Sequence, residues 1–240
     1  MKLWCIHGNL QTPEVWEPFE GRFQFEGQTV TLEKENLWEK VDLGFEKWSN
    51  QFCQKVAEEN NGEHGLLMGY SLGGRLALHT YLEQPEFWKG VVIIAADTGT
   101  SDQDAKRKQL EADQSWGKKF VSKDLESCFA EWDELPVFGG IPNSAPRDLG
   151  QFDPEQIQAC FDNYSKGRQE DLLPALRRVQ SPPLFYLSGE KDLKYTNIGQ
   201  MLQSECPVVQ HKVIENAGHR VPWENPDGFV DEAQRFLDSL

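Results

Sequence analysis

Gly69-Tyr70-Ser71-Leu72-Gly73 lies between an apolar run at residues 65–70 and a segment of helical composition at residues 72–81. A Gly-x-Ser-x-Gly stretch between a strand and a helix is typical of a sharp, strained turn that holds the serine hydroxyl in the open. Gly69 and Gly73 have no side chain, so the strand before the serine and the helix after it can approach each other closely. The pattern therefore predicts a reactive hydroxyl at Ser71.

The segments on both sides of this turn alternate between strand and helix patterns. Short apolar runs predict strands, and apolar residues at helical spacing predict helices. The expected strands are residues 3–6, 29–32, 65–70, 91–96, 184–187 and 208–214, and the expected helices are 44–60, 72–81, 196–203 and 227–240. Residues 9–27 read as loop. This order predicts an α/β fold with a mostly parallel sheet and helices on both faces.

The alternation stops between residues 97 and 173. Charged helical patterns and turns with proline and glycine replace it, and several aromatic residues are spread through the stretch. We interpret residues 97–173 as a helical cap inserted into one domain that spans residues 1–240, a length that a single core can fill.

A serine hydroxyl becomes nucleophilic or basic only when an imidazole handles its proton and a carboxylate orients that imidazole. In this type of fold the chain order is serine, acid, histidine. His219 follows the last expected strand, and the other four histidines are expected to be structural or solvated. Asp192 and Glu190 both follow the strand at 184–187, and the Gly-x-x-Asp spacing from Gly189 favours Asp192. We expect a triad of Ser71, Asp192 and His219.

The turn that follows the first expected strand contains His7 and Gly8. A loop at this place supplies one backbone donor of an oxyanion hole, and the residue after the nucleophile supplies the other. The expected donors are the backbone N–H groups of Asn9 and Leu72.

The net charge of −15 disfavours nucleic acid and anionic membrane surfaces as partners. Residues 101–125 differ, since they hold six basic and five acidic residues. The five cysteines are scattered, and neither a membrane-spanning run, a signal peptide nor a phosphate-binding glycine loop is apparent. We expect a cytoplasmic protein that acts on a small molecule without a metal or cofactor, with homo-oligomerisation left open.

Four motifs occur in an order that is similar to the α/β-hydrolase superfamily over essentially the whole chain. Within that superfamily they resemble the 2-succinyl-6-hydroxy-2,4-cyclohexadiene-1-carboxylate synthase family of menaquinone biosynthesis. The motifs are Gly69-Tyr70-Ser71-Leu72-Gly73-Gly74-Arg75, Trp132-Asp133-Glu134-Leu135-Pro136-Val137-Phe138, Gly189-Glu190-Lys191-Asp192-Leu193-Lys194-Tyr195, and Ala217-Gly218-His219 followed by Glu224-Asn225-Pro226.

The resemblance implies a cofactor-free lyase that eliminates pyruvate from a chorismate-derived succinyl compound. In such an enzyme Ser71, assisted by His219 and Asp192, removes a proton and forms no acyl-enzyme. The positions of Tyr70, Arg75 and Trp132 match residues that line the substrate pocket of that family.

The chain departs from that family in its cap, where arginines are expected near positions that hold Gln109 and Asp162. A shift of register would allow a nearby basic residue to replace them, the candidates being Lys106, Arg107, Lys108, Lys166 and Arg168. Two other functions stay open at this point. One is a carboxylesterase or thioesterase that works through an acyl-enzyme, and the other is a non-catalytic binding module.

Overall fold

The computed structural model describes all residues, 1–240, and contains a six-stranded sheet whose neighbouring strands are all parallel. Its strand order is β4-β1-β5-β6-β7-β8, which confirms the α/β fold class. The strands of this sheet are β1 (Lys2–Ile6), β4 (Thr31–Glu35), β5 (Gly65–Tyr70), β6 (Trp88–Ile94), β7 (Leu184–Gly189) and β8 (Val209–Ile214). A separate two-stranded hairpin pairs β2 (Gln24–Phe25) with β3 (Gln28–Thr29).

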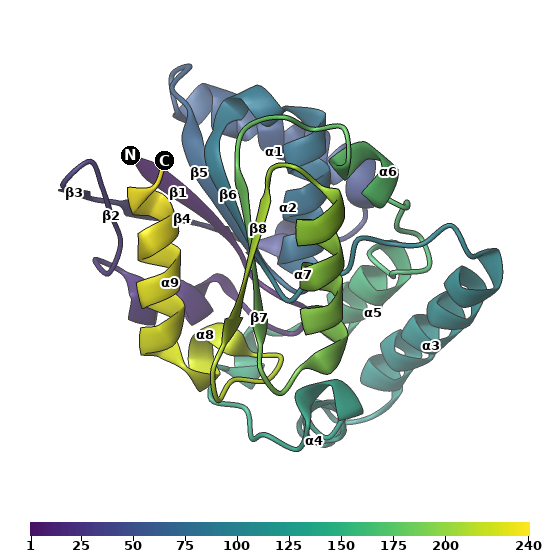
Figure 1. Ribbon diagram of the computed structural model, residues 1–240. Coiled ribbons are helices and arrows are strands. Elements are labelled where there is room, and N and C mark those ends of the chain that lie inside the picture. Colours follow the sequence, from purple (N-terminus) through teal and green to yellow (C-terminus); the bar gives the residue numbers. More distant parts are fainter.

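Helices cover both faces of the sheet (Figure 1). The helices are α1 (Phe45–Glu59), α2 (Leu72–Glu83), α3 (Gln103–Ser122), α4 (Leu125–Asp133), α5 (Pro154–Asn163), α6 (Leu173–Leu176), α7 (Leu193–Glu205), α8 (Val221–Glu224) and α9 (Pro226–Asp238). None of them is long and apolar enough to cross a membrane.

Successive side chains of each strand point to opposite faces of the sheet, so the core consists of two clusters. In β1, Trp4 and Ile6 pack in the cluster that holds α1, α2 and α7, whereas Leu3 and Cys5 pack in the cluster that holds α9. Successive side chains of a strand point to opposite faces, so an uninterrupted apolar run is the pattern that a sheet covered on both sides requires.

The segment at 9–27 differs from the loop that its sequence suggests. A 3-10 helix, η1 (Pro13–Phe19), buries Val15, Trp16 and Phe19 against α8 and α9. The two prolines of this helix and its irregular apolar spacing match neither the strand nor the α-helix period. The expected strand at 29–32 is also corrected, because Thr29 ends the hairpin and the strand that pairs with β1 runs from Thr31 to Glu35.

Helices α3, α4 and α5 connect β6 to β7 and lie beyond the ends at which the parallel strands finish (Figure 1). Trp116, Trp132 and Phe161 pack edge to face in this segment. The segment closes over the residues that follow β5, β7 and β8, where ligand sites of parallel sheets form.

Candidate active site

Ser71 lies at the turn between β5 and α2, in a backbone conformation that residues other than glycine rarely adopt. Its φ is 51° and its ψ is −110°. Its N–H donates to the carbonyl of Ile94 at 2.9 Å, which ties the turn to the neighbouring strand. Such conformations cost about 1–3 kcal/mol and persist where surrounding structure holds them.

The glycines beside Ser71 leave space that the neighbouring backbone fills. A Cβ on Gly73 would lie 2.2 Å from the carbonyl oxygen of Ile6 and 2.4 Å from that of His7. A Cβ on Gly69 would lie 2.4 Å from the carbonyl oxygen of Gly73. Backbone atoms cannot rotate away as the end of a side chain can, so the turn requires glycine at both positions.

We therefore expect Gly73→Ala to lower the free energy of unfolding by about 3 kcal/mol, through overpacking against the end of β1. Gly150→Ala is the matched control, because its nearest atom is Asp148 Oδ1 at 3.3 Å in an exposed 3-10 helix (Leu149–Gln151). Urea denaturation followed by circular dichroism measures both variants. Equal stability of the two variants would contradict the steric argument.

Ser71, His219 and Asp192 form a continuous hydrogen-bonded chain. His219 Nε2 lies 3.2 Å from Ser71 Oγ, and His219 Nδ1 lies 2.7 Å from Asp192 Oδ2. His219 follows β8 and Asp192 follows β7, so both come from the same edge of the sheet as Ser71. The imidazole can accept the serine proton while the carboxylate holds its other nitrogen.

The surroundings of His219 keep its ring neutral. Its side chain is 4% exposed and lies among the rings of Tyr70, Phe138 and Tyr195. Burial lowers the pKa of His219 below its ordinary value of 6.5, although Asp192 acts in the opposite direction. A neutral imidazole is the form that can take a proton from a hydroxyl.

Glu190 lies outside this chain of contacts. Its Oε2 accepts from the backbone N–H of Asn216 at 2.9 Å, and its side chain is exposed. Asp192 is buried, and its second oxygen accepts from the N–H of Tyr195 at the start of α7. Of the two acids at the end of β7, only Asp192 contacts His219.

The backbone N–H groups of Asn9 and Leu72 have no hydrogen-bond acceptor in the protein. Both residues line the same cavity as Ser71. Leu72 begins α2, where the first N–H groups of a helix have no partner within the helix. Two free N–H groups beside a serine hydroxyl suit an oxygen that develops negative charge.

A cavity of about 290 Å³ lies over Ser71, between the sheet edge and the α3–α5 segment. Tyr70, Arg75 and Trp132 all line it. Gln109 also lines it, with its amide nitrogen 2.8 Å from Asp113 Oδ1, whereas Asp162 does not. The structure holds no group of three or more His, Cys, Asp or Glu side chains placed to bind a metal ion.

Four cationic residues join Arg75 in the cavity wall, and they are Arg147, Lys166, Lys194 and Arg220. Lys166 is the only one of the five substitutes considered for the cap arginines that reaches the cavity. Arg220 directly follows His219 in the sequence, so the motif that identifies His219 also indicates Arg220. Arg147 lies in an irregular segment with no motif to indicate it.

The geometry places a serine, a histidine and an aspartate at the edge where the strands of a parallel sheet end, and the comparisons with known proteins identify the family of this fold. Residues 5–232 match the family model described as "Alpha/beta hydrolase family". The chain belongs to the α/β hydrolase family and is an enzyme.

Among curated proteins the chain is similar to 2-succinyl-6-hydroxy-2,4-cyclohexadiene-1-carboxylate synthase of Salmonella heidelberg (strain SL476). The two are 31% identical over 175 residues, which cover 71% of this chain and 67% of the relative. Among solved structures it is similar to MenH from S. aureus, with a TM-score of 0.85, 19% identity, and coverage of 100% of this chain and 94% of that one. Carboxylesterase CesB from Bacillus subtilis shares the fold, with a TM-score of 0.67, 16% identity, and coverage of 98% and 83%.

Proposed function

We propose that this enzyme is a lyase that eliminates pyruvate from a succinyl-enolpyruvyl-cyclohexene carboxylate, the reaction type of menaquinone biosynthesis. The observation that supports it most directly is the Ser71–His219–Asp192 chain at the floor of a cavity whose wall holds five cationic side chains. The likeness to curated synthases at 31% identity supports the same substrate class.

In this reaction the Ser71 oxygen takes a proton from the ring carbon that bears the succinyl group, while His219 accepts the hydroxyl proton. The electron pair of the broken C–H bond forms a new ring double bond. The existing ring double bond shifts, and the bond to the enolpyruvyl oxygen breaks. The enolpyruvate that leaves takes up one proton to become pyruvate, equivalent to the proton that His219 holds, and the imidazole returns to its neutral form. The free N–H groups of Asn9 and Leu72 would stabilise the negative charge that develops on the succinyl carbonyl oxygen.

The two free N–H groups also favour a second candidate, a carboxylesterase or thioesterase. In that chemistry Ser71 attacks an acyl carbon and the same donors stabilise the tetrahedral oxyanion. The lyase and the esterase would use the same triad, so the two functions are distinguished by the substrates that the enzyme turns over.

Purified enzyme offered the succinyl-enolpyruvyl-cyclohexene carboxylate is expected to release pyruvate, measured with a coupled lactate dehydrogenase assay. Short p-nitrophenyl esters and acyl thioesters are offered in parallel. Turnover of an ester or thioester without pyruvate release would replace the lyase assignment with acyl transfer.

The lowered pKa of His219 predicts where activity is lost on acidification. Because burial keeps the imidazole neutral below its ordinary pKa of 6.5, the acid limb of the kcat/KM profile should have its midpoint below pH 6.5. Initial rates from pH 4.5 to 9, with circular dichroism at each pH, give this midpoint. A midpoint above 6.5 in folded protein would show that the carboxylate of Asp192 outweighs burial.

A further inference from the structure

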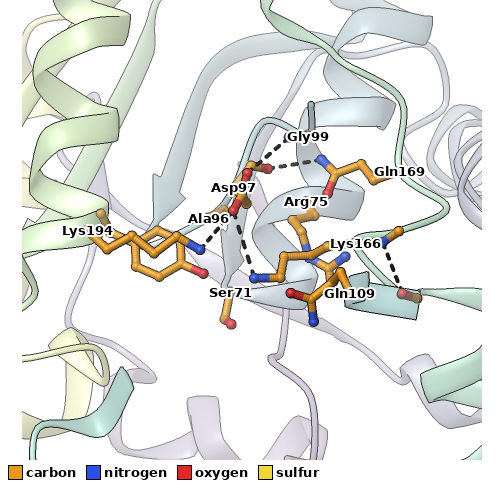
Figure 2. A network of polar contacts seen from close by, with 12 residues as sticks. Ser71, Arg75, Ala96, Asp97, Gly99, Gln109, Lys166, Gln169 and Lys194 are labelled. Atoms are coloured by element: carbon orange, nitrogen blue, oxygen red, sulfur yellow. Dashed lines mark hydrogen bonds and ion pairs between the residues drawn. The ribbon is translucent and has the colours of Figure 1, made fainter. Parts of the chain in front are cut away.

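Three cationic side chains converge on one part of the cavity wall, next to Ser71. Lys194 Nζ lies 3.0 Å from Asp97 Oδ2, and Lys166 Nζ lies 4.0 Å from the same oxygen. Figure 2 shows the two ammonium groups approaching Asp97 from opposite sides, with Arg75 beside Lys166. Asp97 follows β6, Lys166 follows α5 and Lys194 lies in α7, so three distant parts of the chain build this cluster.

The acidic groups nearby do not balance these cations. Arg75 makes no ion pair, since its guanidinium donates to the carbonyl of Tyr164 at 2.9 Å and lies over the ring of Phe45. Asp113 also lines the cavity, where its two oxygens accept from the Gln109 amide and the Ser165 hydroxyl, and its charge acts on Arg75 without forming an ion pair. Three cations therefore face two carboxylates. Asp97 is the only carboxylate that pairs with the lysines.

The pKa of Lys166 reflects this imbalance. Burial lowers it, the ammonium of Lys194 and the guanidinium of Arg75 lower it further, and Asp97 alone opposes them. A bound anion would supply the missing negative charge and offset the cost of the partly buried ammonium.

The other two cationic side chains of the cavity wall, Arg147 and Arg220, pair with a carboxylate of the protein. Arg147 makes two hydrogen bonds to Asp133, at 2.7 and 3.1 Å, and Arg220 forms an ion pair with the same carboxylate. Arg220 is 2% exposed and its guanidinium lies 3.7 Å from the centre of the Phe138 ring. Both arginines are held by direct contacts within the wall, whereas Arg75 beside the two lysines has no carboxylate partner.

We propose that Lys166 and Lys194, together with the unpaired guanidinium of Arg75, form the subsite that binds a carboxylate of the substrate, in place of the arginines expected near Gln109 and Asp162. The inference rests on the proposed function for the identity of that carboxylate, which belongs to a polycarboxylate whose reacting carbon lies at Ser71. Ammonium groups on flexible stems bind as point charges, so this subsite recognises charge with less geometric selectivity than a guanidinium pair.

Succinate is a suitable probe because it carries carboxylates and undergoes no turnover. Ligand-observed NMR titrations give its dissociation constant with the wild type, Lys166→Met and Lys194→Met. We expect each substitution to raise that constant about tenfold or more, the effect of one lost charge-assisted contact. Lys108→Met is the control, because it removes the same charge from an exposed site of α3 that does not line the cavity.

Two further measurements distinguish the loss of a specific contact from misfolding and from a general effect of net charge. Lys166→Arg should retain most of the affinity, and Lys166→Met should melt close to or above the wild-type temperature, because the partly buried ammonium that is removed lies between two other cations and Asp97 keeps its pair with Lys194. Succinamate, which has one carboxylate fewer, should lose affinity for the wild type and depend less on Lys166.

Unchanged succinate affinity in both lysine variants, or no saturable binding by the wild type, would overturn the subsite. An equal loss in Lys108→Met would also overturn it, because net charge would then explain the effect. Binding that depends on Lys166, in an enzyme that releases no pyruvate, would refute the proposed function and leave the subsite standing.

Discussion

Ser71→Ala should lower kcat/KM for pyruvate release by about four powers of ten or more, with the fold retained. Ser71 lines the cavity, and no other hydroxyl lies against His219 Nε2. Removing one oxygen leaves the rest of the turn in place, because Ser71 is partly exposed and its backbone N–H still donates to Ile94. A coupled pyruvate assay gives the rate, and thermal melting monitors the fold.

Ser204→Ala is the matched control, because this serine lies exposed on α7 and donates only to the carbonyl of Met201. It should keep wild-type activity. Near-normal turnover by folded Ser71→Ala protein would remove the serine from the chemistry.

A fluorophosphonate probe tests whether the hydroxyl is activated at all, independently of the natural substrate. Labelling should occur at Ser71 in the wild type and should be lost in His219→Ala, since the imidazole accepts the proton of the attacking hydroxyl. An unlabelled wild type would favour the non-catalytic binding module that the fold also allows.

Asp192→Asn should lower kcat/KM about 10³- to 10⁴-fold, because an amide neither fixes the required tautomer of His219 nor stabilises its protonated form. Glu190→Gln is the matched comparison: it makes the same chemical change two residues away, in an exposed side chain that binds the backbone of Asn216. We expect Glu190→Gln to stay close to wild-type activity.

The same pyruvate assay serves for both variants, with the pH profile as a second readout. Loss of the carboxylate removes a group that raises the pKa of His219, so the acid limb of Asp192→Asn should move further down in pH. Comparable losses in the two variants would contradict the assignment of Asp192 as the orienting acid.

Local patterns predicted most of the strands and helices. The expected strand at 65–70 coincides with β5 (Gly65–Tyr70), because an apolar run between a glycine and a tight turn has clear ends. The strand expected at 91–96 begins earlier, at Trp88, where buried and exposed residues still alternate. The segment at 9–27 differs from the expected loop because η1 packs on distant partners such as Trp223 and Phe229.

The positions and chemical types of Ser71, Asp192 and His219 followed from sequence alone. Each comes after a strand of the sheet, and strands of a parallel sheet end at one edge, so the topology brings their side chains together. The Gly-x-Ser-x-Gly pattern indicates Gly69 and Gly73 locally, although the atoms that exclude a Cβ from Gly73 belong to Ile6 and His7, which are distant in the sequence.

Which charged side chains line the cavity depends on the tertiary structure. Lys166 reaches the wall whereas Lys106, Arg107, Lys108 and Arg168 do not. Arg147 and Arg220 share the carboxylate of Asp133, which is distant from both in the sequence. Which way a side chain of the α3–α5 segment points depends on how each helix packs on its neighbours, and that packing is set by contacts across the whole chain.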